Sequence, residues 1–570
     1  MTMPAGPTGS SSTAAARPRR RRVVRRLPSW AALLGAVVGY WLSFTPSLLP
    51  RPWLLQAVAA AVTALIGYVV GAVVGRILQI WLEPPPRVRR IAWGVLLAGG
   101  LAAVVWVTAW SVRWQGDARR AVAMDPRVVW WQWALVPVVA VVLFALLLLI
   151  GRAIRLGTRA LGRLLGRVMP TPMAVGAAVA LVVVVIVGVV QGFLLRGLLD
   201  MAEGSAELAN DTIQPDVPQP TLPTLSGGPQ SLEAWSTLGF NGREFVAKTP
   251  TRAQISAFTG RPATDPVRVY VGLRSAPTLE QRARLAVAEL ERTGAFHRKV
   301  LTIMSTTGSG WINENVATPL EYMYGGDSAM VAIQYSYLPS WISFLTESEA
   351  TDAGRALYTA VYDHWRSLPA DHRPKLLLAG ESLGSYATEQ AFEGSLARIA
   401  SSGATGVLLV GPTPDNPIRH QVTDHRDAGT PQWLPVYQNG HTVRFARRGP
   451  DLDRPPGAPW PSPRVVYLQN GSDPVTWWET SLILHRPQWL RPPRAPDLSP
   501  DMQWYPLVTF WQVVCDLAGA NNVPDGYGHR FGTLPVQAWS RIAPPPGWTA
   551  ADADRLSHLL ASQREDDKEP

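Results

Sequence analysis

Cysteine is almost absent from this chain of 570 residues, which contains only Cys515. No disulfide can therefore form within the chain, and we expect Cys515 to be a small buried hydrophobic residue. The sequence also lacks CxxC pairs, the HExxH pattern and other regular spacings of metal ligands, and its 9 histidines are scattered. Metal catalysis is therefore not expected, and we predict no cofactor.

Charged residues are missing from five long apolar stretches in the first 200 residues. Most stretches are long enough to cross a bilayer as a helix, and we expect five crossings. The absence of ionisable residues within them argues against an ion or proton pathway. The first stretch could be the core of a signal peptide, but no small-residue cleavage site follows it. The stretches cover residues 29–45, 53–75, 91–112, 130–151 and 172–195.

Small residues recur at helical spacing within these stretches. Gly35 and Gly39 form one such series, and Gly67, Gly71 and Gly75 form another. Residues of this size allow two helix backbones to approach closely, so we predict that these glycines lie on helix-packing faces.

Arginine is distributed unevenly around the apolar stretches. The segments 17–26, 76–90 and 152–167 hold 16 arginines, whereas the two alternate loops hold 5. By the positive-inside rule, the N-terminus is cytoplasmic, and five crossings place everything after Arg196 outside the cytoplasmic membrane. The first 200 residues contain 22 arginines and 4 acidic residues, while the whole chain has a net charge of +11, so the remainder is net acidic. We therefore expect a lipid bilayer as partner and no nucleic acid.

A change of composition near residue 200 divides the chain. Residues 200–238 are rich in proline, glycine and polar residues, which predicts a linker. From 239 to 549, strand-like and helix-like stretches alternate, as in a mostly parallel sheet covered by helices. We expect a basic arm at 1–28, a transmembrane domain at 29–199 and a charged, solvated tail at 550–570. The strand-like runs are 267–273, 300–304, 329–335, 375–379, 406–410 and 464–468.

The pentapeptide Gly380-Glu381-Ser382-Leu383-Gly384 lies between an apolar strand-like run and a helical pattern. It fits the G-x-S-x-G nucleophile elbow of the α/β-hydrolase fold. The serine of such a turn has strained backbone angles, so the residues two positions before and after it must lack bulk. The sequence therefore predicts an α/β-hydrolase fold with Ser382 as the nucleophile.

A serine hydroxyl needs a histidine to take its proton and a carboxylate to orient that histidine. In this fold the partners follow the serine in the order acid, then histidine. Asp473 comes soon after the strand-like run that ends at Leu468, and His529 lies in a glycine-rich loop further on. We predict Ser382, Asp473 and His529 as the catalytic triad.

Both partner assignments have alternatives. Asp473 could be a turn residue before Pro474, and His529 could be an exposed loop residue, with His441 or His485 as the base. Four other acidic residues lie in predicted loops, but none follows a strand so directly: Asp415, Asp424, Asp427 and Asp497.

An oxyanion hole requires two backbone N–H groups, one of them from the residue after the nucleophile. Leu383 would supply this group, and Thr307 or Gly308, in the small-residue loop 305–310, would supply the other. The loop could instead cradle a phosphate, but no Walker lysine follows it and no helix-opening G-x-G-x-x-G pattern is present.

Several longer motifs accompany the elbow: TTGSGW at 306–311, QYSYLPSW at 334–341, YLQNGSDPVTWW at 467–478 and GYGH at 526–529. Together with GESLG they make residues 239–540 resemble a bacterial family of membrane-anchored α/β-hydrolases. In that family a multi-helix membrane domain precedes the catalytic domain, so the resemblance takes in the apolar stretches as well. It implies Ser382, Asp473 and His529 as the triad, although the family pattern has proline at the position of Thr306.

Aromatic residues cluster near these motifs, and we predict that Trp311, Tyr337, Trp341 and Trp477 bind the substrate, although such residues are more often part of a core. With the membrane domain, they favour a lipidic or cell-envelope ester or thioester as substrate.

The predicted function is that of a membrane-anchored serine hydrolase. An acyltransferase would use the same triad, and a non-catalytic assembly or transport factor with a hydrolase-like domain is the other alternative. The sequence does not indicate an oligomeric state.

Overall fold

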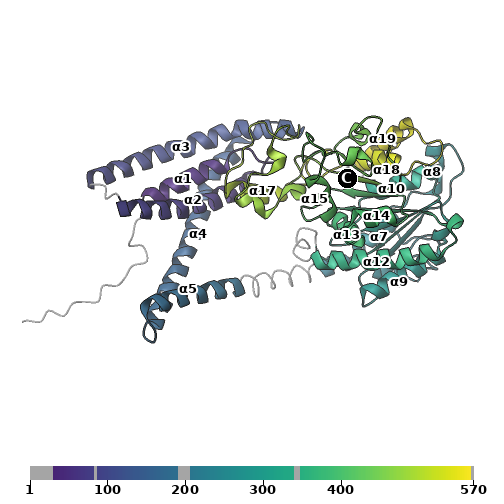
Figure 1. The fold of residues 1–570 in the computed structure, drawn as a ribbon, viewed down its shortest axis with the longest axis horizontal. Coiled ribbons are helices and arrows are strands. Elements are labelled where there is room, and N and C mark those ends of the chain that lie inside the picture. Colours follow the sequence, from purple (N-terminus) through teal and green to yellow (C-terminus); the bar gives the residue numbers. More distant parts are fainter. Residues whose placement is uncertain (1–29, 82–85, 190–205, 339–346, 567–570) are drawn as a thin grey trace, which may run out of the picture.

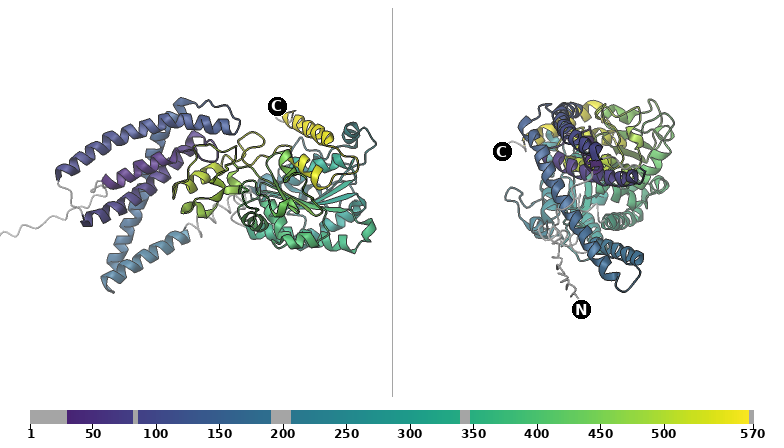
Figure 2. Two further views of the ribbon diagram at one scale, coloured as in Figure 1. Left: turned by 45° about the horizontal axis from the view of Figure 1, so that its top comes forward. Right: turned by 90° about the vertical axis from the view of Figure 1, so that its left-hand side faces the viewer.

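The computed structural model describes residues 30–81, 86–189, 206–338 and 347–566. Over these residues the chain forms an N-terminal group of helices that projects from one end of an α/β domain (Figure 1). Figure 2 shows the same arrangement from two other directions.

Each of the five apolar stretches forms a helix over most of its described residues. Among the described residues, three helices contain a segment long and apolar enough to cross a membrane, namely Trp53–Leu78, Arg90–Ala121 and Trp130–Leu165. The first and last helices are shorter, so helix length does not confirm five crossings, and residues 190–195 of the last stretch lie outside the described residues. The helices are α1 (Trp30–Ser43), α2 (Trp53–Trp81), α3 (Pro86–Ala121), α4 (Trp130–Leu165) and α5 (Thr171–Val187).

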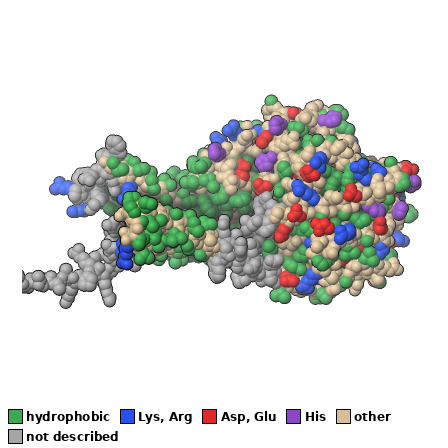
Figure 3. Space-filling model, turned by 60° about the horizontal axis from the view of Figure 1, so that its bottom comes forward, with side chains coloured by type: hydrophobic (Ala, Val, Ile, Leu, Met, Phe, Trp, Pro, Cys, Tyr) green, Lys and Arg blue, Asp and Glu red, His purple; other side chains and the backbone are tan. Residues whose placement is uncertain are grey.

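Glycines bring α1 and α2 into backbone contact, as their spacing predicted. A Cβ atom on Gly35 would collide with the carbonyl oxygen of Gly67, and one on Gly39 would collide with that of Thr63. Any larger side chain at these positions would push the two helices apart. The outer surface of the helical part is largely hydrophobic (Figure 3). Such a continuous apolar surface suits lipid better than water.

In the described part of the α/β domain, seven parallel strands form a single sheet. All six predicted runs form strands, and one further strand, Val443–Ala446, was not predicted. The strands are β1 (Val267–Val271), β2 (Val300–Ser305), β3 (Ser328–Ile333), β4 (Lys375–Glu381), β5 (Gly406–Val410), β6 (Val443–Ala446) and β7 (Arg464–Leu468). Their order across the sheet is β1-β3-β2-β4-β5-β7-β6. The predicted fold class, a mostly parallel sheet flanked by helices, is confirmed.

Helices cover both faces of the sheet, and each face has its own hydrophobic core. Neighbouring strand residues alternate between the cores, as for Leu377 and Leu378. One face carries α9 (Leu279–Arg292), α12 (Glu347–Ser367), α13 (Leu383–Ala391), α14 (Leu396–Ser401) and α15 (Pro417–Asp424). The other carries α7 (Gly239–Ala247), α8 (Arg252–Thr259), α10 (Glu314–Met323), α18 (Leu534–Ile542) and α19 (Ala550–Asp566). Between β7 and α18 the described chain also forms the helices α16 (Pro474–Trp477) and α17 (Val508–Leu517).

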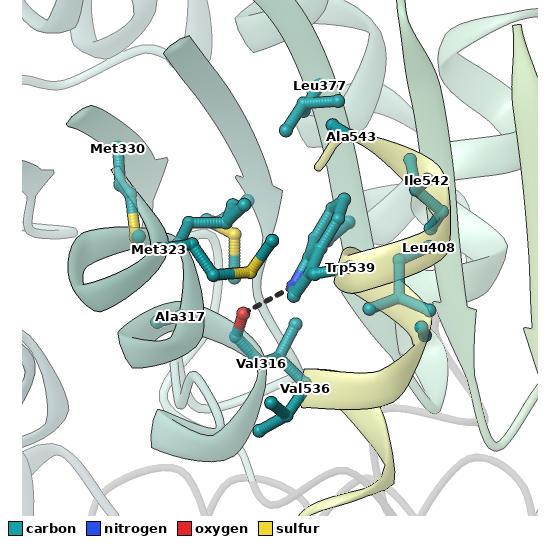
Figure 4. Packing of buried hydrophobic residues seen from close by; sticks show 14 of the residues in the cluster. Val316, Ala317, Met323, Met330, Leu377, Leu408, Val536, Trp539, Ile542 and Ala543 are labelled. Atoms are coloured by element: carbon teal, nitrogen blue, oxygen red, sulfur yellow. Dashed lines mark hydrogen bonds between the residues drawn. The ribbon is translucent and has the colours of Figure 1, made fainter. Parts of the chain in front are cut away.

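Trp539 of α18 lies at the centre of the second core, among Leu377, Leu408 and Met323 (Figure 4). Its side chain is fully buried, and its indole N–H donates a hydrogen bond to the carbonyl oxygen of Val316 at 2.8 Å. Because its one polar group is satisfied, this large side chain joins α18 to α10 without a desolvation penalty.

The described part of the predicted linker 200–238 packs on the α/β domain instead of spanning free space. Leu225 is buried in the core and forms a parallel bridge with Arg268 of β1. The side-chain oxygen of Asn210 accepts a hydrogen bond from Nε2 of Gln334 at 3.0 Å. The proline-rich composition disfavours regular structure but does not prevent docking.

The segment from Ala550, expected to be a solvated tail, forms the helix α19. Its Ala553, Leu556 and Leu560 side chains are buried in the same core as Trp539. The expectation followed the charged residues, whereas apolar residues at helical spacing decide where the helix packs.

Candidate active site

Ser382 stands at the turn between β4 and α13, where the sequence placed it. Its backbone angles are φ +53° and ψ −123°, a strained conformation for a residue other than glycine, and its N–H donates to the carbonyl oxygen of Val410 at 2.8 Å. A Cβ atom on Gly380 would collide with the carbonyl oxygen of Gly384, and one on Gly384 with that of Ser305. The turn thus has the geometry of a nucleophile elbow, and only glycine fits on either side of it.

Asp473 and His529 are hydrogen-bonded to each other. The Nδ1 atom of His529 lies 2.7 Å from Oδ2 of Asp473, and both side chains are buried. Asp473 is also the N-cap of α16, because its Oδ1 accepts from the N–H of Val475 at 2.9 Å and its Oδ2 accepts from the hydroxyl of Thr476 at 3.1 Å. These bonds fix the carboxylate in the orientation that holds the imidazole.

The imidazole of His529 lies close to the elbow. A Cβ atom on Gly411 would collide with its Cε1, and Gly411 directly follows Val410, the acceptor of the Ser382 N–H. The Nε2 atom is buried and has no hydrogen-bond partner among the described residues. The ring therefore has one nitrogen bound to a carboxylate and the other free at the carboxyl end of the central strands.

The charge of the site favours a protonated imidazole. Burial is the largest single influence and lowers the pKa of His529, but the charge and hydrogen bond of Asp473, together with a smaller contribution from Glu381, raise the pKa above its ordinary value. Glu381, the residue before Ser382, is held by Asn313, whose Nδ2 donates to its Oε2 at 2.7 Å. Glu381 and Asn313 were not singled out from the sequence. The variable position within the G-x-S-x-G pattern was the only signal for Glu381.

Further residues that sequence reasoning missed hold the histidine loop. The N–H of Gly528 donates to the hydroxyl of Ser472 at 3.0 Å, and Nδ2 of Asn470 donates to the carbonyl oxygen of Gly528 at 2.9 Å. The Ser472 hydroxyl in turn donates to Oδ2 of Asp497 at 2.8 Å. Asn470 and Ser472 stand within the motif that contains Asp473, so the motif was the available signal.

The alternative bases and acids lie elsewhere. His441 and His485 are exposed, as are Asp415 and Asp424. Asp497 binds Ser472 rather than a histidine. The last candidate, Asp427, accepts hydrogen bonds from the N–H groups of residues 438 and 439. Of the predicted candidates, the structure pairs only Asp473 with His529.

The predicted oxyanion loop begins beside the elbow, but one of its N–H groups is already occupied. The N–H of Thr307 donates to the carbonyl oxygen of Trp311 at 3.1 Å. The N–H groups of Leu383 and Gly308 have no acceptor among the described residues. Of the two residues predicted to join Leu383, Gly308 is thus the one whose N–H is not occupied by another described residue.

The predicted substrate-binding aromatics occupy different environments. Trp477 is only 3% exposed and donates its indole N–H to the carbonyl oxygen of Asn470 at 2.9 Å, so it belongs to the core. Trp311 is 39% exposed, and Tyr337 is half-buried. Trp341 lies outside the described residues. The aromatic clustering therefore did not identify a single pocket.

Comparisons with known proteins match both parts of the chain. The family described as "Alpha/beta-hydrolase family" matches residues 267–556, and "Alpha/beta-hydrolase family N-terminus" matches residues 44–250. No curated protein and no solved structure matches. The first match covers half of the chain and includes Ser382, Asp473 and His529, and the second covers most of the helical part. The chain belongs to this alpha/beta-hydrolase family, with its N-terminal helical region and its α/β domain.

Proposed function

We propose that this protein is a membrane-anchored serine hydrolase that cleaves an ester or thioester through an acyl-enzyme. The observation that carries the proposal is the buried hydrogen bond of 2.7 Å between His529 and Asp473. The imidazole of His529 also lies beside the strained turn of Ser382. A nucleophile, a base and an orienting acid in this order are the parts that serine hydrolysis needs.

The proposed reaction uses these residues in two steps. Nε2 of His529 accepts the hydroxyl proton as Oγ of Ser382 attacks the carbonyl carbon, and Asp473 stabilises the imidazolium that forms. The N–H groups of Leu383 and Gly308 would bind the oxyanion. The imidazolium then protonates the leaving alcohol or thiol, and a water molecule, activated by the same nitrogen, releases the acid and restores the serine.

A lipidic or cell-envelope substrate fits the surroundings of this site best. Three of the described helices are long and apolar enough to cross a membrane, and their outer surface is apolar, so the α/β domain would be held at a bilayer surface. We place the N-terminus in the cytoplasm and the α/β domain outside, because the arginine-rich segments flank the opposite ends of the helices. A tethered enzyme meets membrane amphiphiles at a higher local concentration than soluble esters.

Active-site labelling tests the proposal. The purified full-length protein should react with a fluorophosphonate probe, and Ser382→Ala should remain folded but lose the label completely. Ser401→Ala, which removes an exposed hydroxyl from the same domain, is the matched control and should label like the wild type. Labelling that persists in Ser382→Ala would move the nucleophile elsewhere, and an unlabelled wild type would favour a non-catalytic role.

Product analysis separates hydrolysis from acyl transfer. With a p-nitrophenyl ester and a long-chain alcohol present together, a hydrolase releases mainly free acid. Predominant formation of the alkyl ester would instead assign the acyltransferase alternative.

A further inference from the structure

The connection between α1 and α2 is inserted into the α/β domain at α17. Arg51 of this connection forms a buried ion pair with Asp516 of α17, with 2.7 Å between Nε and Oδ1. The other carboxylate oxygen of Asp516 accepts hydrogen bonds from the N–H of Leu48 at 3.0 Å and from the hydroxyl of Ser47. Figure 1 shows α17 between the long helices and the sheet. One carboxylate of the α/β domain therefore binds three groups of the helical part.

The same contact reaches the ends of α2 and α3. Nη1 of Arg51 donates to Oε1 of Gln56 at 2.9 Å, and its backbone N–H donates to Oε1 of Gln115 at 3.1 Å. From α17, Nε2 of Gln512 donates to the carbonyl oxygen of Thr45 at 2.9 Å. A buried charge that loses its partner is strongly unfavourable, so this network allows little displacement of α17 from the helices.

The end of α17 also positions His529. The carbonyl oxygen of Asp516 accepts the N–H of Gly519 at 2.9 Å, which closes the end of the helix. The next residue, Ala520, accepts the backbone N–H of His529 through its carbonyl oxygen at 2.8 Å. A Cβ atom on Gly528 would lie only 2.6 Å from that same oxygen. The chain from Asp516 to Ala520 thus sets where the histidine backbone can lie.

Apolar packing joins the same parts. A hydrophobic cluster contains Leu48 from the α1–α2 connection and Val122 from the α3–α4 connection. Its other members include Val523 and Trp477, with Tyr527 packed against it. Trp477 follows Asp473 by four residues, and Tyr527 precedes His529 by two. The segments that carry the acid and the histidine are therefore supported by the ends of the membrane helices.

We propose that Arg51 is a positioning residue of the hydrolytic site, acting through Asp516, α17 and Ala520 on His529. The helical part is then a component of the catalytic machinery as well as an anchor, which explains why more than one helix is present. This inference rests on the proposed function, because it assigns Arg51 a role in the reaction of Ser382.

The test compares two buried ion pairs in the full-length protein. Asp516→Asn removes the charge that binds Arg51, and Glu321→Gln removes one of the two charges that bind Arg268, between β1 and α10, where Nε and Oε1 of Glu321 are also 2.7 Å apart. Active sites are first titrated with the fluorophosphonate, and kcat and KM are then measured per titrated site with a short p-nitrophenyl ester. We expect kcat to fall about 10- to 100-fold in Asp516→Asn with KM nearly unchanged. A displacement of the His529 imidazole by about 1 Å is enough to slow the chemical step by this factor, whereas substrate binding does not depend on the position of the base.

The control separates positioning from folding. Glu321→Gln should reduce the yield of titratable sites without changing kcat per site. Two results would overturn the inference while leaving the Ser382→Ala result intact. One is a kcat per site in Asp516→Asn equal to that of the wild type, and the other is an equal loss of kcat per site in Asp516→Asn and Glu321→Gln.

If Asp516→Asn yields no folded protein, Arg51→Lys serves instead, because it keeps the charge but loses the fork that reaches both Asp516 and Gln56. It should lower kcat per site, and a kcat per site equal to wild type would again overturn the inference.

Discussion

Two carboxylates, those of Asp473 and Glu381, raise the pKa of the His529 imidazole from different positions. Asp473 is bound to Nδ1 and accounts for most of the increase in pKa, whereas Glu381, next to the nucleophile, contributes less. Glu381 is held by Asn313 at the start of α10, on the side of the oxyanion loop. At the residue scale, the pH at which the proposed base would become active therefore depends on a residue outside the proposed triad.

Glu381→Gln should extend activity to lower pH. His529 acts as a base only when neutral, so activity falls as the pH drops through its raised pKa. Removing the Glu381 charge lowers that pKa, and the acidic limb of the kcat/KM profile should move to lower pH. The measurement is a pH series with a p-nitrophenyl ester, with Asp371→Asn, a change at an exposed residue, as control. An acidic limb that stays in place or moves to higher pH would contradict this assignment.

Two elements of the α/β domain depend on contacts that sequence patterns do not report. Strand β6 has only four residues and contains Arg444, which interrupts its apolar run. The guanidinium of Arg444 is nevertheless buried, because it donates to the carbonyl oxygens of Gly440, Leu452 and Ala458 and stacks on Trp460. Helix α19 is likewise charged overall but contributes apolar side chains to the core.

Leu556→Ala tests whether α19 is an integral part of the domain. The Leu556 side chain is completely buried, so its truncation should lower the free energy of unfolding by about 2–5 kcal/mol. His558→Ala, at an exposed position of the same helix, should change it by less than about 0.5 kcal/mol. Urea denaturation of the detergent-solubilised protein, followed by tryptophan fluorescence, measures both. Equal stability of the two variants would mean that α19 does not contribute to the core.

At the scale of the whole molecule, exposed tryptophans and arginines lie at opposite ends of the described N-terminal helices. Exposed tryptophans stand where the helices meet the α/β domain, including Trp130 and Trp131 at the start of α4 and Trp511 on α17. The far halves of the helices carry arginines, such as Arg159 and Arg163 near the end of α4. Tryptophan favours the interface between lipid and water, so the bilayer surface would lie close to the α/β domain.

Cysteine accessibility tests the proposed orientation. Val168→Cys, between α4 and α5, and Asp371→Cys, in the α/β domain, place thiols at positions that are 81% and 78% exposed. On intact cells a membrane-impermeant maleimide should label Asp371→Cys only, and both should label after permeabilisation. The wild type is the control, because Cys515 is buried. Labelling of Val168→Cys alone on intact cells would reverse the orientation.

Local pattern was sufficient for the turn at Ser382, for six of the seven described strands and for the apolar helices. The steric demand for glycine around Ser382 and the periods of strand and helix operate over a few residues, so they can be read directly from the chain. The order of Ser382, Asp473 and His529 followed from the fold class once the elbow suggested it. The docking of the linker and of α19, and the core position of Trp477, could not be read in this way.

The remaining features depend on residues that are far apart in the chain. Asp473 and His529 are 56 residues apart, and Arg51 and Asp516 are 465 apart. The packing of all the helices and strands determines which distant groups meet. A single contact between them lowers the free energy only when the rest of the fold has already brought the two partners together. The sequence alone therefore determined which residues could form the proposed triad. The tertiary structure decided that the hydrogen bond between Asp473 and His529 is supported by the ends of the N-terminal helices.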